Sequence, residues 1–93
     1  MRNILKKIKT NLTIGSWIQS SSTDVAEIIG NSNFDWVCVD LEHGNISNEK
    51  LKDMVRVFEL TKKFSVARLK SKNPDDVANV LDTGVNGIII PHV

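Results

Sequence analysis

Four short runs of mainly aliphatic residues recur along the chain, and segments with the spacing of amphipathic helices separate them. Each run has the length of a buried strand, and together they cover residues 12–17, 36–41, 64–69 and 87–91. Strands that alternate with helices pair in parallel through right-handed crossovers. The pattern therefore predicts an α/β protein in which three helices connect a four-stranded parallel sheet of order 1-2-3-4.

The second connecting segment has the clearest helical pattern. Its apolar residues Leu51, Met54, Val55 and Phe58 share one face, while lysines and acids occupy the other. Ser47 supplies an N-cap hydroxyl at the start of this segment. We therefore expect a helix that covers one face of the sheet.

The first connecting helix is shorter, with Val25, Ile28 and Ile29 predicted to face inward. Gly30 is predicted to end it in the left-handed conformation that glycine tolerates. Three residues can serve as its N-cap: Ser22, Thr23 and Asp24.

The third connecting helix has well-marked ends. Asn73 is the predicted cap, Pro74 takes the first helical position, and Gly84 closes the segment. A leading amphipathic helix is also expected over residues 3–9, ahead of the first strand.

Length and composition restrict the class of protein. The 93 residues suffice for one modest core, so a single domain over residues 1–93 is expected. The net charge is +1 and the basic residues are scattered, which argues against a nucleic-acid partner. No apolar stretch reaches the length of a membrane span or of a secretion signal. The single cysteine, Cys38, lies in an apolar run without a disulfide partner, so a reduced, cytoplasmic setting is expected.

Polar residues collect where the predicted strands end. In parallel α/β folds the ligand site forms outside the carboxyl ends of the strands. A base, carboxylates and a guanidinium are therefore expected on one rim, where they can bind and activate a small anionic carbonyl compound. These residues are Trp17, Asp40, Glu42, His43 and Arg68, with His92 added on position alone.

Each of these residues also has a purely structural interpretation. An isolated histidine like His43 is more often a surface residue, but Asp40 three positions earlier is close enough to orient its imidazole. Asp40 can instead cap a loop, and Glu42 can be solvated. Arg68 can form a salt bridge rather than bind an anion. Trp17 can be a core residue.

Four segments of the chain resemble, in order and spacing, the HpcH/HpaI aldolases: residues 15–17, 35–44, 66–68 and 82–91. The most specific piece is the Asp-Leu-Glu-His-Gly stretch of residues 40–44, which follows an Asp-Trp opening. The resemblance implies the N-terminal half of a TIM (β/α)8 barrel. It also implies a carbon–carbon lyase that cleaves 4-hydroxy-2-oxoacids to pyruvate and an aldehyde with a divalent cation, Mg²⁺ or Mn²⁺.

The resemblance also implies a role for each rim residue. By position, His43 would be the general base and Asp40 its dyad partner. Arg68 would stabilise the developing enolate oxygen. Trp17 would shape the pyruvate pocket, and Glu42 would organise it.

The family pattern extends beyond this chain. In the family that it resembles, the metal is held by a Glu and an Asp after the fourth strand, so no metal ligand is expected here. An eight-stranded barrel needs roughly 200 or more residues. We therefore expect a piece truncated after strand four that is inactive alone and needs a C-terminal half or further copies of itself. Two other functions stay open: a non-catalytic half-barrel that serves as an assembly or interaction module, and an open α/β domain that binds a small anion.

Overall fold

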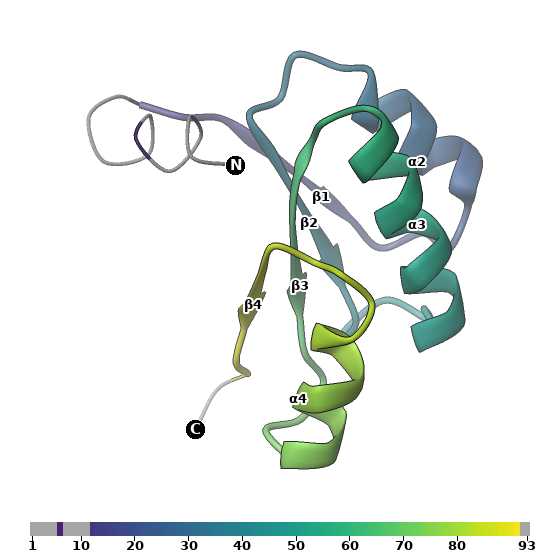
Figure 1. The fold of residues 1–93 in the computed structure, drawn as a ribbon, viewed down its shortest axis with the longest axis vertical. Coiled ribbons are helices and arrows are strands. Elements are labelled where there is room, and N and C mark those ends of the chain that lie inside the picture. Colours follow the sequence, from purple (N-terminus) through teal and green to yellow (C-terminus); the bar gives the residue numbers. More distant parts are fainter. Residues whose placement is uncertain (1–5, 7–11, 92–93) are drawn as a thin grey trace.

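The computed structural model describes residue 6 and residues 12–91, and within residues 12–91 four strands alternate with three helices (Figure 1). The strands are β1 (Gly15–Ile18), β2 (Trp36–Asp40), β3 (Phe64–Arg68) and β4 (Gly87–Ile89). The helices are α2 (Thr23–Gly30), α3 (Asn48–Leu60) and α4 (Pro74–Leu81). All neighbouring strands are parallel and the order is β1-β2-β3-β4, which confirms the predicted topology. The predicted helix over residues 3–9, apart from Lys6, and His92 lie outside the described residues.

All four strands differ from their predicted bounds, and β2 and β3 each end one residue earlier than predicted, at Asp40 and Arg68. Strand β1 begins at Gly15 rather than residue 12, because Leu12 and Ile14 are 88% and 62% exposed and precede the ladder with β2. It also extends one residue further, since Ile18 pairs with Val39. Strand β4 ends at Ile89 rather than residue 91; its last ladder partner is Arg68, and the Leu69 N–H that follows donates to the Ile89 carbonyl at 3.0 Å.

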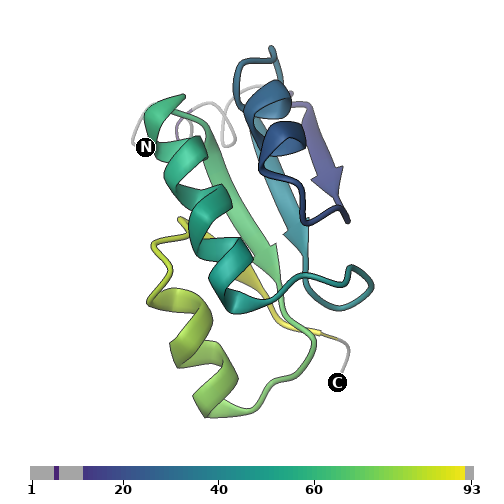
Figure 2. The ribbon, with the colours of Figure 1, turned by 90° about the vertical axis from the view of Figure 1, so that its right-hand side faces the viewer.

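The core lies between the sheet and a single helical layer. Helices α2, α3 and α4 lie on the same face of the sheet (Figure 2). The predicted inner face of α3 is confirmed, because the four apolar residues predicted to lie on it are fully buried: Leu51, Met54, Val55 and Phe58. They pack against strand residues that point to the same side, including Val37, Val39 and Ala67. No helix in the described part of the chain is both long and apolar enough to cross a membrane.

Alternation along the strands sends the remaining side chains to the other face of the sheet. On β2, Cys38 and Asp40 alternate with the core residues Val37 and Val39. In the parallel register Trp17 lies beside Cys38 and Arg68 lies beside Asp40. The predicted rim residues that lie on strands, Trp17, Asp40 and Arg68, therefore share one face of the sheet near the carboxyl ends of the strands.

The predicted helix caps are confirmed. Among the three candidates for α2, Ser22 is the cap, and its side chain accepts a hydrogen bond from the backbone of Val25. Ser47 caps α3 and Asn73 caps α4 in the same manner. Helix α4 ends at Leu81, and Gly84, where the segment was predicted to close, has a φ of +95°, a left-handed backbone that glycine tolerates.

The prediction for Gly30 is wrong. Gly30 stays in α2, Asn31 follows it with a φ of −89°, and Gly84 is the positive-φ glycine of the described chain. The reason for glycine is space, because a Cβ at Gly30 would lie 2.5 Å from Oγ1 of Thr61. Glycine thus permits the close approach of α2 to the end of α3.

The inward orientation predicted for Ile28 is also wrong. Ile28 is 70% exposed, whereas Ala26 is fully buried. At about 100° per residue the two side chains point roughly 200° apart, so both cannot face the core. The close approach that Gly30 permits selects the face of α2 that carries Ala26.

Candidate active site

The side chain of Asp40, the last residue of β2, is the centre of the polar cluster. It is completely buried, and Arg68 of β3 binds it with two nitrogens. Nε donates to Oδ1 at 3.1 Å and Nη2 donates to Oδ2 at 2.7 Å. Such a two-pronged arrangement uses the planar fork of the guanidinium and fixes its orientation.

Four further donors complete the shell around this carboxylate. Oδ2 accepts from Trp17 Nε1 and from Gln19 Nε2, each at 3.0 Å. Oδ1 accepts from the backbone N–H groups of Glu42 and His43, also at 3.0 Å each. Burial by itself raises the pKa of Asp40, but the donors, above all Arg68, outweigh burial and hold that pKa well below its usual range. Asp40 is therefore a fixed anion.

The guanidinium of Arg68 is confined on several sides. Its carbon atom lies 5.1 Å from the centre of the Trp17 ring, within the range of a cation–π contact. Its Nε lies 3.4 Å from Oε1 of Glu42, and the hydrogen bond to Asp40 raises the pKa of Arg68. The hydrogen bonds found among the described residues engage Nε and Nη2, which leaves Nη1 available to a ligand.

The ring of His43 stands at the open edge of this cluster, 62% exposed. Its Nδ1 contacts Nη2 of Arg68. Because a guanidinium nitrogen can only donate, Nδ1 is the acceptor and the proton of the neutral ring lies on Nε2. Nδ1 is 3.7 Å from Oδ2 of Asp40, and Nε2 is 3.9 Å from Oε1 of Glu42. Both distances are too long for a hydrogen bond, so neither carboxylate fixes the ring directly.

The structure brings together five of the six residues that the sequence predicted at the rim, and the sixth, His92, lies outside the described residues. The link between Asp40 and His43 differs from the expected dyad, since Asp40 bonds the His43 backbone while Arg68 contacts the ring. Sequence reasoning gave no role to Gln19, although its position just beyond β1 and two residues after Trp17 was a usable signal.

The thiol of Cys38 plays no part in this chemistry. It is fully buried, and burial, followed by the charge of Asp40, raises its pKa to about 11. A thiol with that pKa stays protonated near neutral pH, and the protonated form is a poor nucleophile.

The described residues do not fit a site for a divalent cation. Nowhere in the described part of the chain do three His, Cys, Asp or Glu side chains come close enough to hold one. The buried carboxylate of Asp40 is also surrounded by donors, which leaves no oxygen lone pair directed at a cation.

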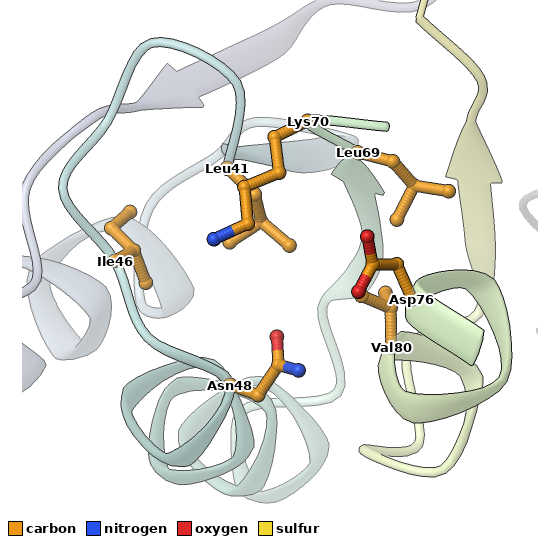
Figure 3. A pocket seen from close by; sticks show the side chains of 7 residues that line it. All are labelled: Leu41, Ile46, Asn48, Leu69, Lys70, Asp76 and Val80. Atoms are coloured by element: carbon orange, nitrogen blue, oxygen red, sulfur yellow. The ribbon is translucent and has the colours of Figure 1, made fainter. Parts of the chain in front are cut away.

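A small cavity lies beyond the carboxyl ends of β2 and β3, near the first turns of α3 and α4 (Figure 3). The polar groups of Asn48, Lys70 and Asp76 lie at its border, and the remaining lining is apolar: Leu41, Ile46, Leu69 and Val80. Its volume of about 20 Å³ suits one water molecule and excludes a three-carbon acid. The Arg68 cluster is therefore the better candidate for substrate binding.

Sequence comparison relates this chain to a family of aldolases and lyases. The sequence model of the family HpcH/HpaI aldolase/citrate lyase matches residues 13–93. A 2-dehydro-3,6-dideoxy-6-sulfogluconate aldolase of Pseudomonas putida is 30% identical over 80 residues, which cover 86% of this chain and 31% of that relative. A hydroxypyruvate/pyruvate aldolase of Rhizorhabdus wittichii is also 30% identical over 80 residues, covering 86% of this chain and 32% of that enzyme.

Solved structures show the same fold. An HpcH/HpaI aldolase/citrate lyase family protein of Burkholderia cenocepacia superposes with a TM-score of 0.88 at 20% identity, covering 100% of this chain and 38% of that protein. Citrate synthase SbnG superposes with a TM-score of 0.84 at 28% identity, covering 95% of this chain and 36% of that enzyme. The chain spans about a third of the length of the curated relatives that it matches. The four-stranded sheet corresponds to part of a TIM barrel, and the chain belongs to the HpcH/HpaI aldolase/citrate lyase family.

Proposed function

We propose that this chain supplies the anion-binding end of an aldolase active site that cleaves 4-hydroxy-2-oxoacids to pyruvate and an aldehyde. The observation that carries the proposal is the guanidinium of Arg68, fixed by Asp40 at the carboxyl end of β3 with His43 against it. The names of two relatives support the substrate class: a hydroxypyruvate/pyruvate aldolase and a 4-hydroxy-2-oxovalerate aldolase of Novosphingobium aromaticivorans.

Aldol cleavage requires a base and a fixed positive charge. The base removes the proton of the C4 hydroxyl, the C3–C4 bond breaks, and its electron pair forms the enolate of pyruvate while the aldehyde leaves. C3 of the enolate then takes up a proton. Arg68 stabilises the enolate oxygen, and because Asp40 already holds the guanidinium in place, little reorganisation is needed when the charge develops.

His43 can act as the base at Nδ1. In the structure the lone pair of Nδ1 faces Arg68, and we propose that a bound 2-oxoacid takes over this contact through its own oxygen. The released lone pair then accepts the hydroxyl proton, while Nε2 keeps its hydrogen. The resulting imidazolium has its Nδ1 3.7 Å from Oδ2 of Asp40 and its Nε2 3.9 Å from Oε1 of Glu42.

Trp17 and Glu42 complete the proposed pocket. Trp17 is 44% exposed and forms the wall beneath Arg68. Glu42 lies between Arg68 and the His43 ring, because its Oε1 is 3.4 Å from Nε of Arg68 and 3.9 Å from Nε2 of His43. A divalent cation, Mg²⁺ or Mn²⁺, remains part of the proposal on the family resemblance, and its ligands would come from outside the described residues.

The proposed partner is the remainder of a barrel, from a C-terminal half or from further copies of the chain. In register, Trp17 pairs with Cys38 and Ile89 with Arg68, which places both on the face opposite the helices. They are 44% and 38% exposed there, an apolar surface that additional strands would cover. The same surface favours the alternative function, a non-catalytic assembly module. The buried thiol of Cys38 fits the cytoplasmic setting that we infer for the complete protein.

Turnover separates these functions. The purified 93-residue chain with Mg²⁺ or Mn²⁺ is expected to cleave a 4-hydroxy-2-oxoacid at no appreciable rate, because the described residues contain no group of three side chains that could hold the cation. The chain joined to the second half of a family barrel is expected to be active. In that enzyme His43→Ala should lower kcat by roughly 10²-fold, with little effect from Lys52→Ala on the exposed face of α3. An unchanged kcat in His43→Ala would exclude His43 as the base, and an inactive joined enzyme would favour the assembly module.

A further inference from the structure

We propose that Gln19 is a positioning residue for Arg68, acting through the buried carboxylate of Asp40. The inference rests on the proposed function, in which Arg68 binds the substrate anion. Gln19 follows β1 directly, and its Nε2 donates a hydrogen bond to Oδ2 of Asp40 at 3.0 Å. This bond links the exit of β1 to the ends of β2 and β3.

Three donors share the same oxygen of Asp40. Trp17 Nε1 and Gln19 Nε2 approach Oδ2 at 3.0 Å each, and Arg68 Nη2 approaches it at 2.7 Å. A buried carboxylate needs such donors, because removal from water without compensating hydrogen bonds is costly. If the Gln19 donor is removed, Arg68 must neutralise more of the negative charge on Oδ2. The guanidinium is then drawn toward Asp40 and presents less positive potential to a bound anion.

Gln19 is suited to this role because it is linked to little else. It is exposed, it belongs to no helix or strand, and its one hydrogen bond among those found between described residues goes to Asp40. Its loss leaves no cavity in the core. By contrast, Trp17 also forms the pocket wall, so its substitution changes several properties of the site at once.

Two substitutions distinguish the effect of the Gln19 N–H donor from the effect of the size and shape of its side chain. Gln19→Met keeps an unbranched chain of similar size and removes the N–H donor. Gln19→Glu keeps the shape and places a second negative charge beside Asp40. Lys52→Met on the exposed face of α3 is the matched control for adding a methionine to the surface.

Nuclear magnetic resonance of the full 93-residue chain provides the readout. The two tryptophans give an internal comparison, because Trp17 Nε1 donates to Asp40 whereas Trp36 Nε1 donates to Thr13. In Gln19→Met the Trp17 indole resonance should shift and that of Trp36 should stay. Hydrogen exchange at Arg68 Nε should become roughly three- to ten-fold slower relative to the backbone amide of Val55, because Asp40 then binds the guanidinium more strongly by up to the free energy of one hydrogen bond. Gln19→Glu should shift the Trp17 resonance further. Lys52→Met should change neither the Trp17 resonance nor the exchange rate at Arg68 Nε.

A general loss of stability would accelerate exchange at Val55 and at Arg68 alike. The positioning role would be overturned if the ratio of the two exchange rates stayed the same and the Trp17 indole resonance did not shift. Pyruvate titration provides a separate arm, in which both Gln19 variants should bind the anion more weakly than the parent chain. If the parent chain shows no pyruvate-dependent shift at Arg68, the proposed substrate fails. The exchange ratio still decides whether Gln19 positions Arg68.

Discussion

Arg68 and Asp40 are 28 residues apart in sequence, yet they are paired in register on neighbouring strands and joined by nitrogen–oxygen contacts of 3.1 and 2.7 Å. The backbone of the sheet, rather than a loop, therefore sets the angle of the guanidinium. Neighbouring parallel strands lie only about 5 Å apart, so little freedom remains for either side chain. This rigidity is what makes the pair suitable for transition-state stabilisation.

Arg68→Lys should impair catalysis although it preserves the charge. A lysine ammonium is a point charge that cannot bind both oxygens of Asp40 and still reach an enolate with a further nitrogen. In the chain joined to a family second half, we expect kcat to fall by roughly 10²-fold, the scale of a lost oxyanion donor. Melting temperature and kcat are measured on the same protein. A near-normal kcat with a lowered melting temperature would show that Arg68 contributes to stability and not to catalysis.

The neutral ring of His43 should carry its proton on Nε2. Contact with Arg68 Nη2 requires an unprotonated Nδ1, because arginine only donates. Two-bond ¹H–¹⁵N correlation spectra at alkaline pH report the tautomer directly, and a His92→Gln background removes the second histidine of the chain. We expect Arg68→Met to weaken the preference for this tautomer. Protonation at Nδ1 in the parent chain would contradict the geometry.

Acid should destabilise the fold partly through Asp40. Because the folded-state pKa of Asp40 lies well below that of the unfolded chain, its ionised form stabilises the fold at pH values above the unfolded pKa. This contribution is lost as the pH falls from about 4 toward the folded pKa. Asp40→Asn should cost roughly 2–4 kcal/mol at neutral pH, because the buried donors lose their anion.

Urea unfolding of the parent and Asp40→Asn proteins at a series of pH values from 7 to 2 tests this linkage. The difference in the free energy of unfolding between them should shrink as the pH falls below about 4. A constant difference over the whole range would show that ionisation of Asp40 contributes nothing to stability.

Gly30→Ala should destabilise the protein despite the higher helix propensity of alanine. The new Cβ would meet Thr61 Oγ1 at 2.5 Å, and the cost of overpacking exceeds the propensity gain. We expect a net loss of about 1–2 kcal/mol. Thr61→Ala removes the nearest atom, so the double variant should lose less than the sum of the single changes. Additive losses in this double-mutant cycle would rule out the clash.

Much of this protein can be predicted from its sequence because the relevant signals are local. The period of apolar residues fixed the helical face of α3, and cap residues such as Ser47 and Asn73 marked where helices begin. Strands that alternate with helices required a parallel sheet, which placed Trp17, Asp40 and Arg68 at one edge.

Tertiary structure decided what depends on distances between elements. Gly30 fitted the pattern of a helix stop, yet its role follows from the approach of Thr61, which is 31 positions away and invisible to local patterns. The orientation of Ile28 followed from the same contact, because a short helix with apolar residues on several sides can turn more than one face to the core.

The same division holds within the candidate site. The sequence by itself determined which charged groups meet at the strand ends, because strand periodicity and parallel pairing fix the face and edge on which a side chain lies. Only the tertiary structure decided how they pair. Asp40 binds Arg68 and Gln19 rather than the His43 ring, because hydrogen bonds depend on differences of a few tenths of an ångström that residue spacing does not specify.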